Sequence, residues 1–157
     1  MPAGGRQAYK RGMPVSLPST PAAAKAIVRG RSFPATREGE TEAQCFTRGT
    51  LEELGVPAHA MRAVLVALDE AASNIVNYAG ATRFGLALSV STQGIKLSLS
   101  DNGRPFDPTL CPEPDVSQQL AVRPIGGLGI HIIRALSRDL SYCRIAGKNR
   151  FRIQLAH

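Results

Sequence analysis

The chain has 157 residues, of which 43% are hydrophobic and 20% charged, and this composition is typical of a single globular domain. Its three cysteines are widely spaced and never form a Cys-x-x-Cys pair, which disfavours a zinc site or a disulfide framework and favours a reducing, cytoplasmic location. The longest apolar run covers only residues 63–68, and prolines interrupt the N-terminal region, so we expect neither a membrane span nor a signal peptide.

The net charge of +7 is concentrated at the N-terminus of the chain. Residues 1–37 hold seven basic side chains and no acidic one, whereas the rest of the chain holds twelve of each. Residues 1–30 are also rich in Pro, Ala and Gly, so we expect a flexible arm there and one domain over residues 31–157. Such an arm is either a solvated tail or a segment that attracts an acidic partner. Direct nucleic-acid binding by the domain is not expected, because the sequence of residues 31–157 has no stripe of basic and aromatic residues.

Hydrophobic periodicity and turn residues predict a mixture of helices and strands. The two longest helical patterns end at Gly55 and Gly80, and glycine commonly terminates helices. In chain order we expect a strand over 31–36, helices over 40–54 and 57–78, strands over 84–90 and 95–100, an irregular stretch over 101–125, a helix over 130–137, and strands over 141–145 and 151–155. Consecutive strands that form hairpins between helices indicate an α+β fold, a two-layer sandwich.

The first polar motif lies on the predicted second helix, in the segment LDEAASNIVNYAG over residues 68–80. Glu70 and Asn74 are four residues apart, so they project from the same face on consecutive turns, and Asn77 lies roughly one further turn along. A carboxylate and an amide oxygen in this arrangement suit Mg²⁺, or act as a base beside a metal ligand. Taken alone, the pattern is more often an ordinary solvated polar face.

The second motif, SDNGRPFDP over residues 100–108, directly follows a predicted strand. Asp-Asn-Gly is typical of a tight turn, because Asn and Gly tolerate positive φ. The functional alternative is that Asp101 accepts a hydrogen bond from the exocyclic amine of a nucleobase. Gly103 would then let the ring approach closely, because it has no Cβ.

The third motif, IGGLGIHII over residues 125–133, is a run of glycines that leads into a predicted helix. A glycine-rich turn exposes successive backbone N–H groups, and the N-terminus of a helix favours anions, so the pair forms a potential phosphate-binding cradle. By itself the signal is weak, because the motif matches neither the dinucleotide fingerprint G-x-G-x-x-G nor the P-loop.

Together and in this order, the three motifs resemble the ATP-binding fold shared by gyrase, Hsp90, MutL and histidine kinases, the GHKL or Bergerat fold. Within that superfamily, E-A-A-S-N followed by N-Y-A, D-N-G-R-P-F-D-P and G-G-L-G-I look like the anti-sigma factor serine kinases. The resemblance covers about residues 31–156, and its most specific element is the P-F-D-P extension at 105–108. It implies a mixed, mostly antiparallel sheet that helices cover on one face.

The resemblance also implies a role for each matching residue. Glu70 would be the general base that accepts the proton of a serine hydroxyl, and Asn74 would ligate Mg²⁺ at the ATP phosphates. Asp101 would bind the adenine amine with Gly103 beneath the ring, and residues 108–125 would form a lid. The other nucleotide-binding candidates are Asn77, the phosphate cradle Gly127, Leu128, Gly129 and Ile130, and two cations that the family pattern does not fix, Arg104 and Arg123.

In function, the chain resembles a cytoplasmic bacterial regulator that binds Mg-ATP and phosphorylates a serine on a STAS-type anti-anti-sigma protein. The same protein would sequester a sigma factor, so that ATP and ADP forms must differ in affinity for the two partners. The resemblance also implies a homodimer. We expect the protein to bind neither nucleic acid nor a membrane directly. The alternative is a non-catalytic ATP-binding switch module that sequesters its partner without phosphotransfer, and the glutamate at position 70 favours the kinase.

Overall fold

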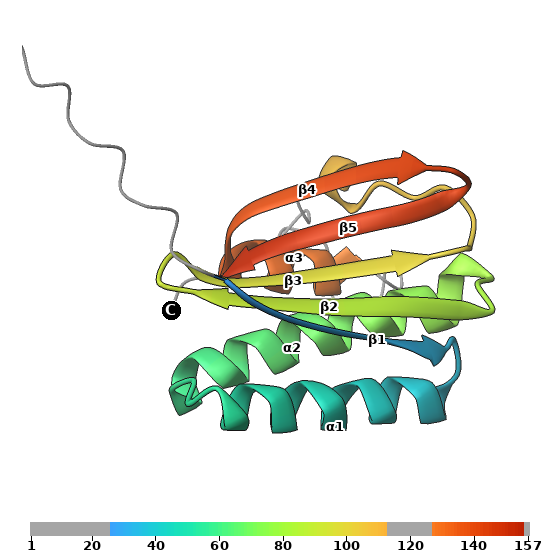
Figure 1. The fold of residues 1–157 in the computed structure, drawn as a ribbon. Helices are drawn as coiled ribbons and strands as arrows, with labels where there is room; N and C mark the ends of the chain where they lie inside the picture. Colours follow the sequence, from blue (N-terminus) through green and yellow to red (C-terminus); the bar gives the residue numbers. More distant parts are fainter. Residues whose placement is uncertain (1–25, 113–126, 156–157) are drawn as a thin grey trace, which may run out of the picture.

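A computed structural model describes residues 26–112 and 127–155 of the chain. They form a sheet layer and a helical layer that lie face to face, as predicted for an α+β two-layer sandwich (Figure 1). In chain order the elements are β1 (Ile27–Pro34), α1 (Arg37–Glu53), α2 (Ala58–Asn74), the π-helical turn η1 (Ile75–Ala79), β2 (Arg83–Ser91), β3 (Gly94–Asp101), the 3-10 turn η2 (Pro108–Leu110), α3 (Gly127–Leu136), β4 (Ser137–Ile145) and β5 (Lys148–Leu155).

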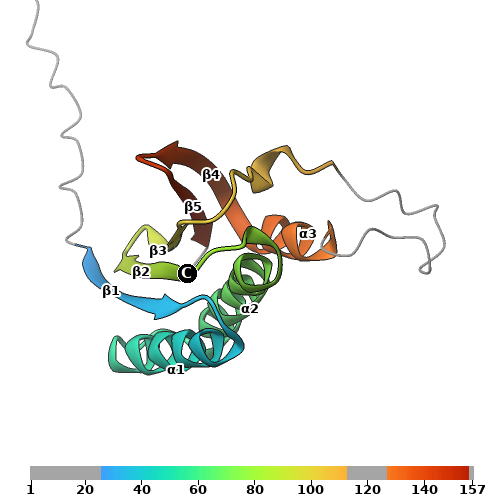
Figure 2. The same ribbon diagram turned by 90° about the vertical axis from the view of Figure 1, so that its right-hand side faces the viewer.

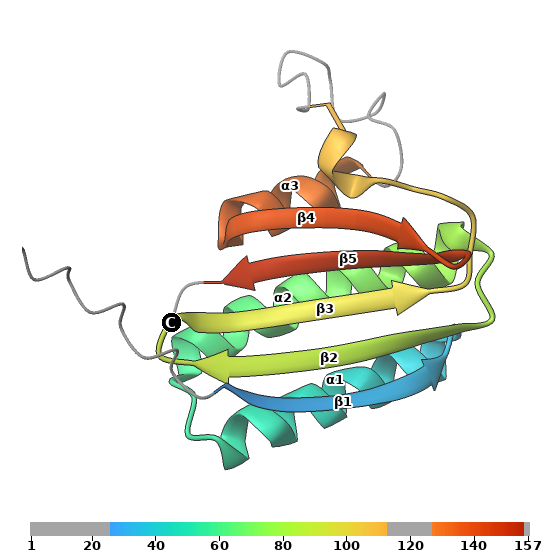
Figure 3. The same ribbon diagram turned by 45° about the horizontal axis from the view of Figure 1, so that its top comes forward.

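The five strands form one sheet in the order β1-β2-β3-β5-β4 (Figure 3). Antiparallel pairing was expected for most of the sheet, and all the described pairs are antiparallel. β1 and β4 are therefore the edge strands. β1 ends at Pro34, two residues before the end of the strand expected over 31–36, and proline is tolerated there because an edge strand leaves part of its backbone unpaired.

β1 begins earlier than its sequence pattern predicted. Residues 27–30, which we assigned to the basic arm, pair with β2 in register, from Ile27 opposite Val90 onward. The first six residues of β1 are exposed, so the segment lacks the alternation of buried and exposed side chains that identifies a strand in sequence. The rest of the predicted arm, residues 1–25, lies outside the described residues.

The hydrophobic core lies between the helices and one face of the sheet (Figure 2). Alternate residues of β3 point into it, and Leu97 is fully buried. They meet the apolar stripe of α2, where Val64 and Leu68 are fully buried. Phe33 and Phe84 pack with ring centroids 5.6 Å apart beneath α1. Burial of this stripe fixes the rotation of α2 about its axis, and therefore the direction in which its polar side chains project.

The C-terminal end of α2 changes geometry before the chain turns. The last turn, η1, is π-helical, and Gly80 follows in the left-handed conformation at φ 63°. Gly55 likewise follows α1 at φ 66°. Both glycines end helices as predicted, because glycine adopts positive φ without a Cβ clash. The carbonyl groups at the end of η1 become acceptors for the second motif.

Other boundaries differ from the predictions by a few residues. α3 begins at Gly127, whereas the sequence predicted a start near residue 130. The prediction excluded Gly127 and Gly129 from the helix because glycine has a low helix propensity. β4 begins at Ser137, where a register shift between Ser137 and Asp139 interrupts the alternation. Residues 113–126, most of the predicted irregular stretch and lid, lie outside the described residues. In the described part of the chain, no helix is both long and apolar enough to cross a membrane.

Candidate functional site

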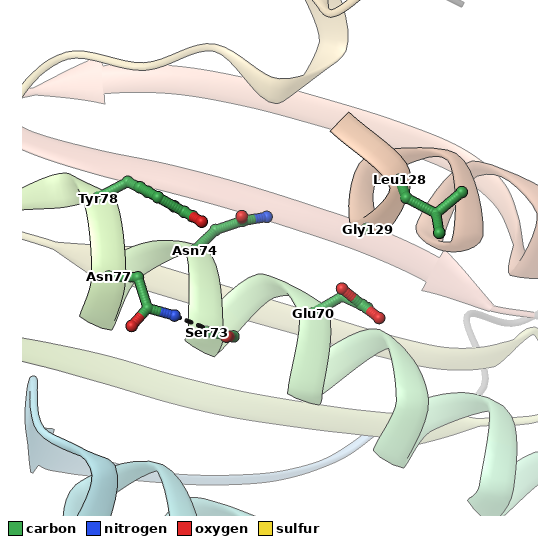
Figure 4. A pocket seen from close by; sticks show the side chains of 7 residues that line it. All are labelled: Glu70, Ser73, Asn74, Asn77, Tyr78, Leu128 and Gly129. Carbon is green, nitrogen blue, oxygen red and sulfur yellow. Dashed lines mark hydrogen bonds between the residues drawn. The ribbon is translucent and has the colours of Figure 1, made fainter. Parts of the chain in front are cut away.

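A pocket of about 230 Å³ joins the first and third motifs (Figure 4). Its lining residues come from the C-terminal part of α2, from η1 and from the first turn of α3: Glu70, Ser73, Asn74, Asn77, Tyr78, Leu128 and Gly129. These segments are far apart in sequence, and they meet because α2 and α3 pack together on the same face of the sheet. The structure therefore brings together Glu70, Asn74, Asn77, Leu128 and Gly129 from the predicted site.

Glu70 lies against the first turn of α3. A Cβ added to Gly129 would overlap Glu70 Oε2 and would lie 3.3 Å from Glu70 Cδ, so only glycine leaves room for the carboxylate in this position. Burial raises the pKa of the Glu70 carboxyl, and the negative charge of Asp69 raises it further. A carboxylate with a raised pKa, beside a helix N-terminus and in a pocket, has the properties of a general base.

Asn74 and Asn77 have different surroundings, although both line the pocket. Asn74 follows Glu70 by one turn and projects on the same side of α2 (Figure 4). Asn77 also donates from Nδ2 to Ser73 Oγ at 2.9 Å, so its amide nitrogen is held by the preceding turn. Asn74 is therefore the better placed of the two to bind a ligand beside Glu70.

The first turn of α3 presents Leu128 and Gly129 to this pocket. α3 starts at Gly127, so the N–H groups of this turn have no acceptor within the helix and point along its axis toward an incoming anion. Ile130 is 1% exposed, and its side chain belongs to the core rather than to the pocket. Ile130 anchors the turn, and its backbone is the part that remains a candidate for phosphate binding.

Asp101 and Gly103 lie outside the lining of this pocket and pack against the end of η1. Asp101 is 7% exposed, and its Oδ1 accepts hydrogen bonds from Gly103 N at 2.8 Å and from Asn149 Nδ2 at 2.9 Å. Among the described residues no hydrogen bond to Oδ2 is found, so this oxygen remains an acceptor for a ligand. A Cβ on Gly103 would lie 2.5 Å from the carbonyl oxygen of Ala79, which gives this glycine a packing role in addition to the predicted one.

Asn149 was missed by the sequence analysis, because it lies between the strands expected over 141–145 and 151–155. It lies opposite Asp101 on β5, is 5% exposed, and donates from Nδ2 to Asp101 Oδ1 and to Arg104 O at 2.8 Å. Its Oδ1 accepts from Tyr142 Oη at 2.8 Å and from Arg144 Nη1 at 2.7 Å. Because both ends of the amide are occupied, Asn149 holds the Asp101 carboxylate in one orientation. The available signal was the alternation along β5, which puts Asn149 on the same face as Phe151 and Ile153.

Of the two predicted cations, Arg104 is described and does not line the pocket. Arg104 donates from Nη2 to Tyr78 O at 2.6 Å and from its backbone N to Ala79 O at 2.9 Å, so it caps the end of η1. Arg123 lies outside the described residues. Arg134 of α3, which the sequence analysis did not select, donates from Nη2 to Thr109 O at 3.0 Å and to Cys111 O at 2.6 Å, and so ties η2 to α3.

The donor atoms of the pocket fit a magnesium ion that is bound together with phosphate. Mg²⁺ prefers oxygen ligands and usually keeps waters and substrate phosphates in its coordination shell. Glu70 and Asn74 offer two such oxygens on consecutive turns. In the described ranges no group of three or more His, Cys, Asp or Glu side chains could form a cage for a metal. Asn74 and Glu70 are the residues that could contact such an ion, with most other ligands coming from the phosphates and water.

Comparisons with known proteins identify the family and the fold of the chain. Residues 33–155 match the family described as histidine kinase-like ATPase domain. The serine/threonine-protein kinase BtrW of Bordetella bronchiseptica is 33% identical over 85 residues, which are 52% of this chain and 60% of BtrW, so the match spans less than two thirds of that relative. The crystal structure of the RsbU and RsbW domains of Rv1364c from Mycobacterium tuberculosis superimposes with a TM-score of 0.58 and 16% identity, over 83% of this chain and 32% of that one.

The structural likeness shows a shared fold, and the family match extends from the end of β1 to the end of β5. It includes all three motifs, the pocket between α2 and α3, and the Asp101–Asn149 pair. The resemblance drawn from the motifs is thereby confirmed: the chain belongs to the histidine kinase-like ATPase domain family.

Proposed function

We propose that this protein uses Mg-ATP to phosphorylate a serine on a STAS-type anti-anti-sigma protein, and that it sequesters a sigma factor in alternation with that partner. The observation that carries the proposal is the position of Glu70. Its carboxylate faces the first turn of α3, in the pocket that also contains Asn74. A kinase of this type needs a base within reach of the serine hydroxyl and a bound γ-phosphate in front of it.

The reaction transfers the γ-phosphoryl group of ATP to a serine oxygen. The bond between the γ-phosphorus and the β–γ bridging oxygen breaks, a bond between serine Oγ and phosphorus forms, and ADP leaves. Glu70 accepts the hydroxyl proton, and the N–H groups at the start of α3 bind phosphate oxygens. Bound Mg²⁺, held by Asn74, would neutralise charge on the phosphates. Positioning and charge neutralisation supply most of the acceleration in phosphoryl transfer.

The surroundings of Glu70 suit this role. A glutamate with an ordinary pKa is a weak base at neutral pH, and partial burial together with the nearby charge of Asp69 raises the pKa of Glu70. Asp69 itself accepts a hydrogen bond from Gln44 Nε2 at 3.3 Å and projects away from the pocket. Its effect on Glu70 is therefore electrostatic, and a substitution there tests basicity without removing a pocket residue.

The adenine subsite follows from the second motif. Asp101 Oδ2 would accept a hydrogen bond from the exocyclic amine, and Asn149 and Gly103 N would hold the other carboxylate oxygen in place. Discrimination of adenine from guanine would result, because guanine presents a carbonyl oxygen where adenine has its amine, and two acceptors repel each other. In this proposal the base lies near η1 and the triphosphate lies toward α3.

Partner switching completes the proposal. The similarity to BtrW, whose name identifies a serine/threonine kinase, and to a chain that contains an RsbW domain supports a regulatory kinase. Nucleotide state would decide which partner binds, because ATP and ADP forms differ in affinity for the antagonist and the sigma factor. We also propose that the protein acts as a homodimer in the bacterial cytoplasm.

The test separates phosphotransfer from nucleotide binding. Glu70→Gln preserves the size of the side chain and removes the base, so it should abolish phosphotransfer to the STAS-type partner while ATP affinity, measured by calorimetry, stays within about twofold. Glu52→Gln, an exposed carboxyl on α1, is the matched control and should retain full activity. If Glu70→Gln turns over normally, Glu70 is not the base. If the wild type binds ATP but never transfers phosphate, the protein is the non-catalytic switch module.

A further inference from the structure

The described part of the domain separates its charges between the two layers. α1 and α2 carry seven acidic and three basic residues. The five strands carry nine basic and two acidic residues, and one of the two acids, Asp101, is buried beside Asn149. The near balance of charge in the domain sequence therefore conceals an acidic helical layer and a basic sheet. This separation has no role in the proposed phosphotransfer.

The basic residues of the central strands project from the face of the sheet opposite the helices. Along β5 the residues Asn149, Phe151, Ile153 and Leu155 are buried, and the alternating Lys148, Arg150 and Arg152 are exposed. Lys96 of β3 is exposed on the same face, because its neighbours Ile95 and Leu97 are buried. Arg150 and Arg152 lie roughly 7 Å apart along the strand. Figure 3 views the sheet from this side, with the helices behind it.

We call this surface the outer sheet face and define it by Lys96, Lys148, Arg150 and Arg152 with the small residues between them. Ser100 and Cys143 flank Arg150 on the neighbouring strands, and Ser98 and Ser141 flank Arg152. These flanking side chains are short, and both arginines are exposed. Nothing in the described ranges covers the face.

The cations of the outer sheet face have no acidic partner within the described residues. The ion pair found among the described residues lies away from this face: Arg31 pairs with Glu42 at 3.7 Å and joins β1 to α1. Asp139 is exposed at the β4 edge, opposite Gln154 rather than opposite an arginine. Four exposed cations with no ionic partner among the described residues make a surface that is complementary to negative charge.

We propose that the outer sheet face binds an acidic segment of a partner protein. Charge complementarity identifies this occupant, and the other classes fit less well. A second copy of the chain would bring the same cations against themselves. Single-stranded nucleic acid needs aromatic platforms, and the aromatic side chains of the strands, Phe33, Phe84, Tyr142 and Phe151, share the core face in the strand register. A membrane surface needs several large apolar groups among the cations. Arg150 and Arg152 are flanked by serine and cysteine, and the exposed Ile145 lies opposite Lys148 at one end of the face.

The face is independent of the nucleotide pocket. The helices that form the pocket cover the opposite side of the sheet, so a partner on the outer sheet face leaves α2, η1 and α3 accessible (Figure 2). ATP and an acidic segment should therefore bind at the same time. An exposed ion pair contributes little by itself, so the interaction depends on several cations together and weakens as salt screens them.

The experiment uses the full chain and a fluorescein-labelled peptide that alternates glutamate and serine. Arg150→Glu combined with Arg152→Glu should raise the Kd of the peptide, measured by fluorescence anisotropy, by about tenfold or more. The matched control, Arg48→Glu with Arg62→Glu, makes the same change of net charge on exposed residues of the helical layer and should change the Kd by less than about twofold. Peptide-induced NMR shifts should fall on β3 and β5, and saturating ATP should leave the Kd unchanged.

Several results would overturn the proposal. An equal loss of affinity in both double variants means that the peptide responds to net charge or to the basic N-terminal segment. Tighter binding of a DNA duplex or of anionic lipid vesicles, abolished by the sheet variant alone, makes the face a phosphate-binding surface instead. Arg150→Gln with Arg152→Gln distinguishes lost attraction from misfolding, since its affinity should lie between that of the wild type and that of the charge reversal. If it binds like the wild type, the arginines do not contribute.

Discussion

Replacing Gly129 by alanine adds one methyl group where the first turn of α3 meets Glu70. The added Cβ would overlap Glu70 Oε2 and would lie 3.3 Å from Cδ and 3.4 Å from Cβ of that residue. Oε2 must therefore move by about 1 Å to reach ordinary contact distance, and a displacement of that size in a reacting group can reduce a rate by roughly a hundredfold. The same steric conflict should also change the free energy of unfolding, which can be measured without a partner protein or nucleotide.

The expected energies follow from two opposing effects. Alanine is about 1 kcal/mol more favourable than glycine within a helix, whereas overpacking typically costs about 1–3 kcal/mol, with the low end appropriate for a side chain that can rotate. Gly129→Ala should therefore lower the free energy of unfolding by about 0–1 kcal/mol in the wild type. In a Glu70→Ala background the clash is absent, and the same substitution should raise it by about 1 kcal/mol.

Urea unfolding of the four proteins in this cycle should give a coupling energy of about 1–2 kcal/mol. Gly49→Ala is the control, because a Cβ at Gly49 in α1 meets nothing within 4 Å. It should stabilise the protein equally whether residue 70 is glutamate or alanine. Additive effects of Gly129→Ala and Glu70→Ala would refute the reasoning, because they would mean that α3 and the carboxylate do not meet in solution.

Three further outcomes test the rest of the site. Asp101→Asn should weaken ATP binding by roughly 10–100-fold in calorimetry, since the carboxylate loses its charge; unchanged affinity would move the adenine subsite elsewhere. Asn149→Ala should lower the free energy of unfolding by about 1–3 kcal/mol in urea, because buried hydrogen-bonding groups around Asp101 lose their partner, and a neutral result would show that water replaces the amide. Phosphotransfer should fall as the pH drops through the raised pKa of Glu70, and Asp69→Asn, which removes a charge that raises this pKa, should move the acidic limb of the rate profile to lower pH. An unmoved limb would assign that titration to another group.

Periodicity was sufficient to predict the layers of the fold and most of the pocket. Glu70 and Asn74 share one side of α2 because they are four residues apart, and the buried stripe of Val64 and Leu68 fixes which side that is. The strands β2 and β3 alternate cleanly, so their positions could be predicted, whereas β5 begins at Lys148, three residues before its predicted start. β1 could not be delimited, because the edge strand is exposed along most of its length and carries no alternation.

The contacts that orient the site could not be predicted in the same way. Asn149 resembles a turn residue after Gly147, and only the register of β5 against β3 brings it opposite Asp101. Gly103 was expected beneath a base, yet its packing against Ala79 depends on the π-helical turn at the end of α2, for which the sequence has no simple signal. Such residues depend on tertiary pairing, whereas Glu70 and Asn74 depend on local helical spacing.

The distribution of charged side chains could likewise be predicted only where it depends on local periodicity. Counting acidic and basic residues along the chain indicated a balanced domain, although the alternation in the segment KNRFRIQL already implies that its three cations share one face. The structure adds the information that this face is opposite the helices and is bordered by serines. The alternation along the strand therefore predicts that these cations share a face. The absence of acidic partners for them among the described residues could not be predicted in this way.

Phosphate transfer to a protein partner is the most direct test of the proposed function. The wild type and Glu70→Gln are each incubated with lysate of the native organism and Mg-ATP, and new phosphoserines are quantified by mass spectrometry. We expect one small STAS-type protein to gain phosphoserine with the wild type and not with Glu70→Gln or with Mg-ADP. If both proteins bind ATP with similar affinity and no protein gains phosphoserine with either, the kinase account is contradicted and the chain is a nucleotide-dependent binding module.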